Sequence, residues 1–217
     1  MPGFSLKWYR LFLTNYKLLD SLRVSLTLGV VSAFLSGIIG TLASFAIVRS
    51  EFRRKEWLNA AIFAPMVISG VVLGVALLSF FDFIHFPRGF VGLVMGHTLL
   101  TIPYVVVVVC ARLAGFDRSL EEAAMNLGAN RLQTFRAVTL PMIAPGIIGG
   151  MMLAFTISFD EFPATQFLAT PQASTVPILV FSMIRTELNP QINVLATVML
   201  VITIGLPMIA QKFLRKK

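Results

Sequence analysis

The chain has 217 residues, of which 57% are hydrophobic and only 13% are charged. Because charged residues supply about a quarter of an average soluble domain, this composition excludes a soluble enzyme, a disordered tail and a disulfide-stapled secreted module. The net charge of +8 would suggest nucleic acid in a soluble protein, but in so apolar a chain the basic residues must first be compared with the loops of a membrane protein.

Residues 1–21 are the first element of the chain. They contain no apolar stretch long enough to span a bilayer and no apolar core of a signal peptide. Their apolar residues instead suit a short helix at the membrane interface, namely Trp8, Tyr9, Leu11, Phe12, Leu18 and Leu19. We therefore predict a loop with an interfacial helix in this segment.

Five later stretches are apolar enough to cross a hydrocarbon core of about 30 Å, which requires about 20 mostly apolar residues in a helix. They cover about residues 22–48, 58–81, 90–111, 143–159 and 192–209. Several contain residues that disturb helices but are tolerated inside a bundle, including Pro65, Pro103, Pro145, Pro207, Gly70 and Gly74. We therefore predict an all-α polytopic membrane protein with five transmembrane helices, forming one domain over residues 1–217.

The basic residues of the loops predict the orientation of these helices. One set of loops carries twelve, which are Arg49, Arg53, Arg54, Lys55, Arg112, Arg118, Arg131, Arg136, Lys212, Arg215, Lys216 and Lys217. The opposite set carries six, which are Lys7, Arg10, Lys17, Arg23, Arg88 and Arg185. Because basic loops stay in the cytoplasm, we predict a cytoplasmic C-terminus and, with five spans, an N-terminus outside. Exporting so basic an N-terminus opposes this rule, so we expect one further span before Met1 and an outside loop over residues 1–21.

The longest cytoplasmic loop, over residues 111–141, has a helical pattern of its own. Its signals are a capping box at Ser119 and Glu122, a terminal glycine at Gly128, a second cap at Asn130, a short helix through Phe135 and a stop at Pro141. An apolar face at helical spacing consists of Leu120, Ala123, Ala124 and Leu127. Taken alone, these features predict an ordinary helical hairpin.

The spacing as a whole resembles the EAA loop of ABC importer permeases, whose pattern is E-A-A, three residues, G, nine residues, I-x-L-P. The matching positions are Glu122, Ala123, Ala124, Gly128, Val138, Leu140 and Pro141, of which only Val138 departs from the usual residue. The resemblance implies a MetI-like type I importer permease, normally with six helices, in which this loop couples to a separate ATP-hydrolysing subunit. Glu122 would either cap its own helix or pair with a base of that partner.

Nearly the whole chain also resembles the second membrane subunit of spermidine/putrescine importers. The likeness is carried by residues 7–9, 111–117, 158–163, 175–177, 181–185 and 187–193. It implies a bacterial inner-membrane importer that has a second permease, two ATPase subunits and an extracytoplasmic binding protein, and no nucleic-acid partner. ATP and magnesium would be held by the ATPase partner, and this chain would have no cofactor, metal or catalytic residue. Importers for opines, other amines and ferric iron share much of the pattern and are the alternative.

Two adjacent acids, Asp160 and Glu161, lie at the outer end of the fourth span. Acids inside a membrane usually face a cavity or a partner because burial in lipid is costly, whereas at the interface they can simply be solvated. Since successive helical residues point about 100° apart, we expect only one to face a path for a cationic substrate, and Asp160, nearer the membrane, is ranked first. The ring of Phe159 could stack on such a cation, although phenylalanine more often faces lipid.

The remaining chemistry-bearing residues form no recognisable site. His85 and His97 lack the carboxylates or thiols of a metal site and are predicted to be structural. The single cysteine, Cys110, excludes an internal disulfide and is predicted to be a small buried residue. No G-x-x-x-x-G-K-[ST], HExxH or GxSxG pattern occurs, which excludes ATP binding by the usual cradle and disfavours an intramembrane hydrolase. A stand-alone secondary transporter is the more serious rival, but it would normally need internal repeats and charged spans.

Overall fold

The computed structural model of the chain describes residues 7–50, 53–186 and 190–214, with side chains in the last helix described as far as Met208. The helices are α1 (Lys7–Thr14), α2 (Tyr16–Arg49), α3 (Lys55–Val67), α4 (Gly70–Phe83), α5 (Phe90–Ala114), α6 (Ser119–Asn126), α7 (Arg131–Thr134), the π-helical turn η1 (Phe135–Thr139), α8 (Leu140–Asp160), α9 (Thr165–Leu168), α10 (Val176–Thr186) and α11 (Gln191–Leu214). Within these residues there is no strand, and one isolated bridge joins Thr170 and Ala173. The all-α prediction is confirmed.

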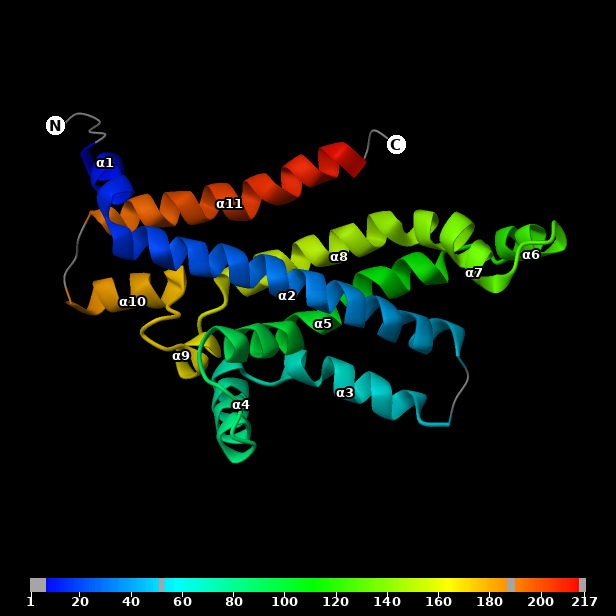
Figure 1. Cartoon of the computed structure of the whole chain (residues 1–217), viewed down its shortest axis with the longest axis horizontal. Helices are drawn as coiled ribbons and strands as arrows, with labels where there is room; N and C mark the ends of the chain where they lie inside the picture. The colour runs from blue at the N-terminus through cyan, green and yellow to red at the C-terminus, as the bar shows by residue number, and fades with distance from the viewer. Residues whose placement is uncertain (1–6, 51–52, 187–189, 215–217) are drawn as a thin grey trace.

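Helices α2, α5 and α8 form the centre of the molecule and pack against one another. They run along its long axis in Figure 1, with α11 lying along the same direction. Small residues bring the backbones close together, since a Cβ added at Gly40 of α2 would lie only 2.8 Å from the Cβ of Val105 on α5. Such close approach through small residues is typical of membrane helices. The buried core at this junction includes Val109, Phe155 and Phe159.

Among the described residues, four helices are long and apolar enough to cross a membrane, over Tyr16–Arg49, Phe90–Ala114, Arg131–Asp160 and Gln191–Met208. The pair α3 and α4 passes the same test together but is bent by 113° between its two halves. The predicted five spans are therefore matched when this pair is counted as one span, which is broken between Val67 and Gly70. Pro65 lies just before the bend, where its ring disturbs the helix. Gly74 lets α4 pack closely, since a Cβ there would lie 2.8 Å from the Cα of Ala164.

Two predicted boundaries are wrong. The sequence predicts a loop with a short interfacial helix over residues 1–21, and α1 is a short helix in this segment. The long helix α2, however, already begins at Tyr16, where the Asn15 side chain accepts a hydrogen bond from the Lys17 N–H and caps the helix. The sequence also predicts that Pro141 ends a helix, yet one continuous helix runs over Arg131–Asp160. In its π-helical turn the Leu140 N–H bonds to the Phe135 carbonyl. Pro141 then sits in the first turn of α8, where the N–H that proline lacks costs little.

The two sets of loops lie at opposite ends of the bundle in Figure 1. One end holds the C-terminal ends of α2 and α5 together with α6 and α7, and the other holds α1, α9 and α10. The bases counted as cytoplasmic in the described loops therefore gather at one end. Three bases of the predicted tail, Arg215, Lys216 and Lys217, lie outside the described residues, as does the segment 187–189.

Candidate functional site

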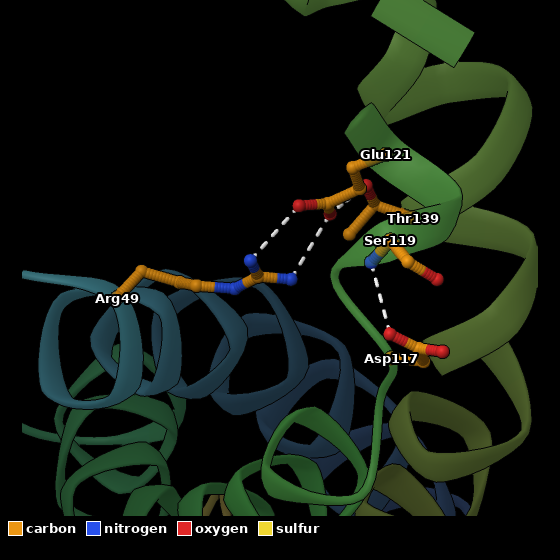
Figure 2. Close-up of polar contacts among 5 residues, drawn as sticks. All are labelled: Arg49, Asp117, Ser119, Glu121 and Thr139. Carbon is orange, nitrogen blue, oxygen red and sulfur yellow. Dashed lines mark hydrogen bonds and ion pairs between the residues drawn. The ribbon is translucent and has the colours of Figure 1, made fainter. Parts of the chain in front are cut away.

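The predicted coupling loop folds as a hairpin of α6 and α7 that projects beyond the ends of α2 and α5 (Figure 1). The predicted capping box at Ser119 and Glu122 is wrong, because no side chain caps α6 from that position. Instead, the Ser119 N–H donates to the Asp117 carboxylate at 2.9 Å, two residues earlier (Figure 2). This hydrogen bond and one from the Ser119 hydroxyl hold the pKa of Asp117 below its ordinary value of 3.8. A carboxylate at this place also suits the positive end of the helix dipole.

The end of α6 is built as the sequence predicts. Gly128 has φ +93°, a left-handed conformation that residues with a side chain rarely adopt. Its N–H bonds to the Met125 carbonyl, and the Ala129 N–H bonds to the Ala124 carbonyl, which together form a Schellman turn. Two residues on, Asn130 caps α7 in a reciprocal capping box with Gln133. The chain therefore reverses direction through local hydrogen bonds alone.

Most residues of the EAA pattern are exposed, and they are spread over the hairpin, the π-helical turn and the start of α8. Glu122, Ala123, Gly128, Leu140 and Pro141 are exposed, whereas Ala124 and Val138 are half-buried. None of the residues of α6 is buried. Large apolar side chains are exposed beside them, with Leu127 at 90% and Leu132 at 58% of full exposure. The hairpin thus presents apolar side chains and the free carboxylate of Glu122 outward, as expected for a surface that binds another protein.

Glu121 behaves differently from its neighbour, and sequence reasoning missed it. Its carboxylate accepts two hydrogen bonds from the Arg49 guanidinium at the end of α2, at 2.8 and 3.0 Å, and one from the Thr139 hydroxyl (Figure 2). The Arg49 guanidinium also lies 5.5 Å from the ring centroid of Phe116. Arg49 and Glu121 are 72 residues apart in the chain, so no local spacing signals the pair. The carboxylate joins α2, α6 and the π-helical turn.

At the opposite end of the bundle, the two candidate path acids also differ from each other. Asp160 is the last residue of α8 and is exposed. Glu161 is half-buried and accepts a hydrogen bond from the Ala164 N–H at 2.8 Å, so it caps the turn that leads into α9. Within the described residues neither acid forms an ion pair. Asp160 is therefore the more exposed of the two acids, and Glu161 is the one that bonds to the backbone.

The third candidate path residue, Phe159, is placed inside the protein. Its side chain is 1% exposed and its ring stacks on that of Phe155 at 5.6 Å between centroids. The expectation that this ring lines a path is therefore wrong for this conformation, because the two phenylalanines fill the core between α2, α5 and α8.

His97 of α5 contacts the residues on both sides of the acids Asp160 and Glu161. Its ring is fully buried, with Nδ1 2.8 Å from the Ser158 hydroxyl on α8 and Nε2 3.0 Å from the Thr165 hydroxyl on α9. Because the Thr165 hydroxyl donates to the Glu161 carbonyl, it must accept from His97, which assigns the proton to Nε2. The prediction that His97 is structural is confirmed.

Comparison with known proteins adds to this geometry. The chain matches the family described as binding-protein-dependent transport system inner membrane component over residues 28–216. It is 34% identical over 215 residues to the spermidine/putrescine transport system permease protein PotC of Escherichia coli K12, covering 99% of this chain and 81% of that protein. It is 40% identical over 205 residues to the putrescine transport system permease protein PotI of the same strain, covering 91% of this chain and 73% of PotI. A solved bacterial alginate ABC transporter, in complex with an alginate pentasaccharide-bound periplasmic protein, shares the fold at a TM-score of 0.78, with 14% identity over 98% of this chain and 83% of the other.

Proposed function

Since this chain belongs to the family of binding-protein-dependent transport system inner membrane components, we propose that it is a permease subunit of an ATP-driven polyamine importer. The observation that carries the proposal is the exposed α6–α7 hairpin, which presents the EAA residues at one end of a bundle of apolar helices. The names of the relatives PotC and PotI support the substrate class, because both belong to transport systems for putrescine or spermidine.

The hairpin would be the contact to a separate ATPase subunit. Leu127 and Leu132 offer apolar surface, and Glu122 offers a carboxylate without a partner among the described residues. Burying such leucines in a cleft would contribute about 1.5–3 kcal/mol each. Two ATPase subunits would hold ATP and magnesium, and a second permease chain would complete the path. This permease chain would itself catalyse no reaction.

The outer end of the bundle would receive the substrate from an extracytoplasmic binding protein. The alginate transporter, which has a related fold, supports a binding-protein partner, because it was solved in complex with a periplasmic protein. The Asp160 carboxylate is exposed there and has no cationic partner in the described part of the chain. A polyamine is a chain of ammonium groups, so an unpaired carboxylate at the mouth of the path would attract it electrostatically. We therefore keep Asp160 as the first candidate for the substrate path and Glu161 as the second.

The orientation follows from the same assignment. The α6–α7 end would face the cytoplasm, where ATP is, and so would the C-terminal end of α11. The end with α1, α9 and α10 would face outward. The twelve bases predicted on the inner side agree with this arrangement, because lysine and arginine are retained in cytoplasmic loops.

The proposal is tested by uptake of radiolabelled putrescine and spermidine into cells that lack other polyamine importers. This chain is co-expressed with the second permease, ATPase and binding protein encoded by neighbouring genes. We expect uptake that requires every subunit and stops when the ATPase is inactivated. Uptake by this chain alone would instead identify a secondary transporter. Uptake of ferric iron or an opine in place of polyamines would keep the importer and overturn the substrate.

A further inference from the structure

We propose that Glu121 and Arg49 form a joint that transmits movement of α6 to the membrane helices α2 and α8, a role separate from docking. The inference rests on the proposed function, since it concerns how a bound ATPase subunit would move the bundle. It makes Glu121 a positioning residue, whereas its neighbour Glu122 belongs to the docking surface.

The geometry of the joint is specific. The two guanidinium nitrogens Nη1 and Nη2 of Arg49 donate to the two carboxylate oxygens of Glu121 at 2.8 and 3.0 Å (Figure 2). This bidentate arrangement fixes both the distance and the relative orientation of two planar groups. The side chains are only 19% and 17% exposed, so water and salt screen the pair less than an ion pair on the surface.

Neighbouring groups hold both partners in place. Arg49 is the last residue of α2, where a cation is favoured by the helix dipole, and its guanidinium lies 5.5 Å from the centre of the Phe116 ring. Glu121 lies in the first turn of α6, where an anion is favoured for the same reason. The dipoles of both helices thus stabilise the charges that meet.

The joint lies between α6, which would contact the ATPase subunit, and the central helices α2 and α8. The backbone of α6 packs against α7 and the π-helical turn, and it makes no extensive contact with α2. The side chains of Glu121 and Arg49 bridge that gap. The Thr139 hydroxyl, from the π-helical turn that begins the α8 span, donates to the same carboxylate. A displacement of α6 is therefore passed at one carboxylate to two of the three central helices.

Adjacent glutamates with opposite surroundings supply a matched pair of variants. Glu121→Gln keeps the size of the side chain but removes the charge that Arg49 binds, whereas Glu122→Gln removes an exposed charge that contacts no described residue. Each variant is assembled into the complete importer. Two quantities are measured: the amount of ATPase subunit that co-purifies with the permease, and putrescine transported per ATP hydrolysed in liposomes.

We expect Glu121→Gln to retain the ATPase subunit as the wild-type importer does and to lower putrescine transported per ATP about tenfold, within the usual range of coupling between sites. Glu122→Gln should instead reduce retention of the ATPase subunit. The joint is overturned if Glu121→Gln loses the ATPase subunit, since Glu121 would then be a docking residue. It is equally overturned if the transport ratio in Glu121→Gln stays unchanged.

A second measurement leaves the joint intact, and so it does not depend on whether Glu121→Gln folds. Spin labels are placed at two exposed sites, Ser50→Cys after α2 and Asn126→Cys at the end of α6, in a chain with Cys110→Ser. If the joint holds, the distance between the labels is the same with and without ATP in the assembled importer, because α2 and α6 move together. A distance that changes with ATP overturns the joint. Failure of the wild-type importer to bind an ATPase or to take up polyamine would instead overturn the proposed function, which the uptake assay measures separately.

Discussion

The two ends of the molecule each carry a pair of adjacent acids, and in both pairs one acid serves the fold while the other stays free. At the α6 end, Glu121 is bound by Arg49 and Thr139, and Glu122 is exposed. At the other end, Glu161 accepts the Ala164 N–H, and Asp160 is exposed. Glu121 and Glu122 are adjacent on α6 and therefore point about 100° apart. Asp160 ends α8 and Glu161 follows it in extended backbone, so the outer pair divides where the helix stops.

The difference between the two ends is the source of positive charge. The inner pair receives a cation from the protein itself, through the bidentate contact of Arg49 with Glu121. In the outer pair Glu161 accepts a backbone N–H, and no arginine or lysine of the described residues forms an ion pair with either acid. An acid that is already neutralised, as Glu121 is by Arg49, suits a rigid joint, whereas an acid without a basic partner, as Asp160 is among the described residues, suits a cationic substrate.

The largest effect is expected at the turn that presents the inner pair. Gly128→Val should reduce polyamine uptake to background, because a β-branched residue at φ +93° is strained by about 1–3 kcal/mol. A strain of that size would lower the population of the correct turn by about 5- to 150-fold. No atom lies within 4 Å of a Cβ built at Gly128, so the effect comes from the backbone and not from crowding. Uptake and retention of the ATPase subunit are measured together.

Gly128→Asn is the matched control, because asparagine adopts positive φ more readily than other residues with a side chain. We expect it to retain most of the uptake that the valine variant loses. If the valine variant transported normally, the shape of this turn would not matter for coupling, and the inner end would depend on charge alone.

The local parts of both ends could be predicted from the sequence. Gly128 at a helix end and Asn130 at a helix start satisfy backbone groups within a few residues, so their roles are encoded in spacing. The apolar spans follow from length and composition for the same reason. Where two local solutions compete, the sequence is ambiguous: the oxygens of Asp117 and Ser119 could both serve the start of α6, and the structure uses Asp117.

The parts that depend on distant contacts could not be predicted. The position of Arg49 in a loop predicts only that it is one of the cytoplasmic bases, and nothing in the neighbouring residues identifies Glu121 as its partner. Beyond the bend, Gly74 of α4 packs against Ala164, about ninety residues later in the chain, and no local spacing indicates this contact. Phe159 was considered for a path because aromatic rings can stack on cations, but its burial is decided by how α2 and α5 surround α8.

The second-largest effect is expected at His97, which holds the segments on both sides of the outer acids. His97→Ala should lower the stability of the purified importer by about 2–3 kcal/mol, because it empties a buried site and leaves the Ser158 hydroxyl without its ring partner. The midpoint of thermal unfolding measures this loss. His97→Gln, which can both donate and accept, should recover part of it. An unchanged midpoint in the alanine variant would show that α9 and Glu161 are held without the histidine.

A smaller effect is expected for the free acid of the outer pair. Asp160→Asn should raise the apparent KM for putrescine about tenfold, the equivalent of one weak charge contact of about 1.4 kcal/mol. Glu161→Gln should have less effect, because a glutamine oxygen can still accept the Ala164 N–H. Initial uptake rates over a range of putrescine concentrations measure both. If the two variants exchanged these effects, Glu161 would be the substrate acid; if neither changed KM, the outer acids would simply be solvated.

The smallest effect is expected at Asp117, which caps α6 from an exposed position. Asp117→Ala removes the acceptor of the Ser119 N–H and should lower uptake only about twofold, since the turn at Gly128 and the Glu121 joint still hold the helix. The pKa of Asp117 lies below 3.8, so its contribution is complete above that pH and is lost only as the pH falls through the lowered value. The ratio of uptake between wild type and Asp117→Ala should therefore stay constant between about pH 6 and 8. A ratio that changes across this interval would mean that another titrating group, and not the cap, is responsible for the loss. A loss as large as that of Gly128→Val would show that α6 is held mainly by its first turn, and the inner end would then depend on Asp117 more than on Glu121.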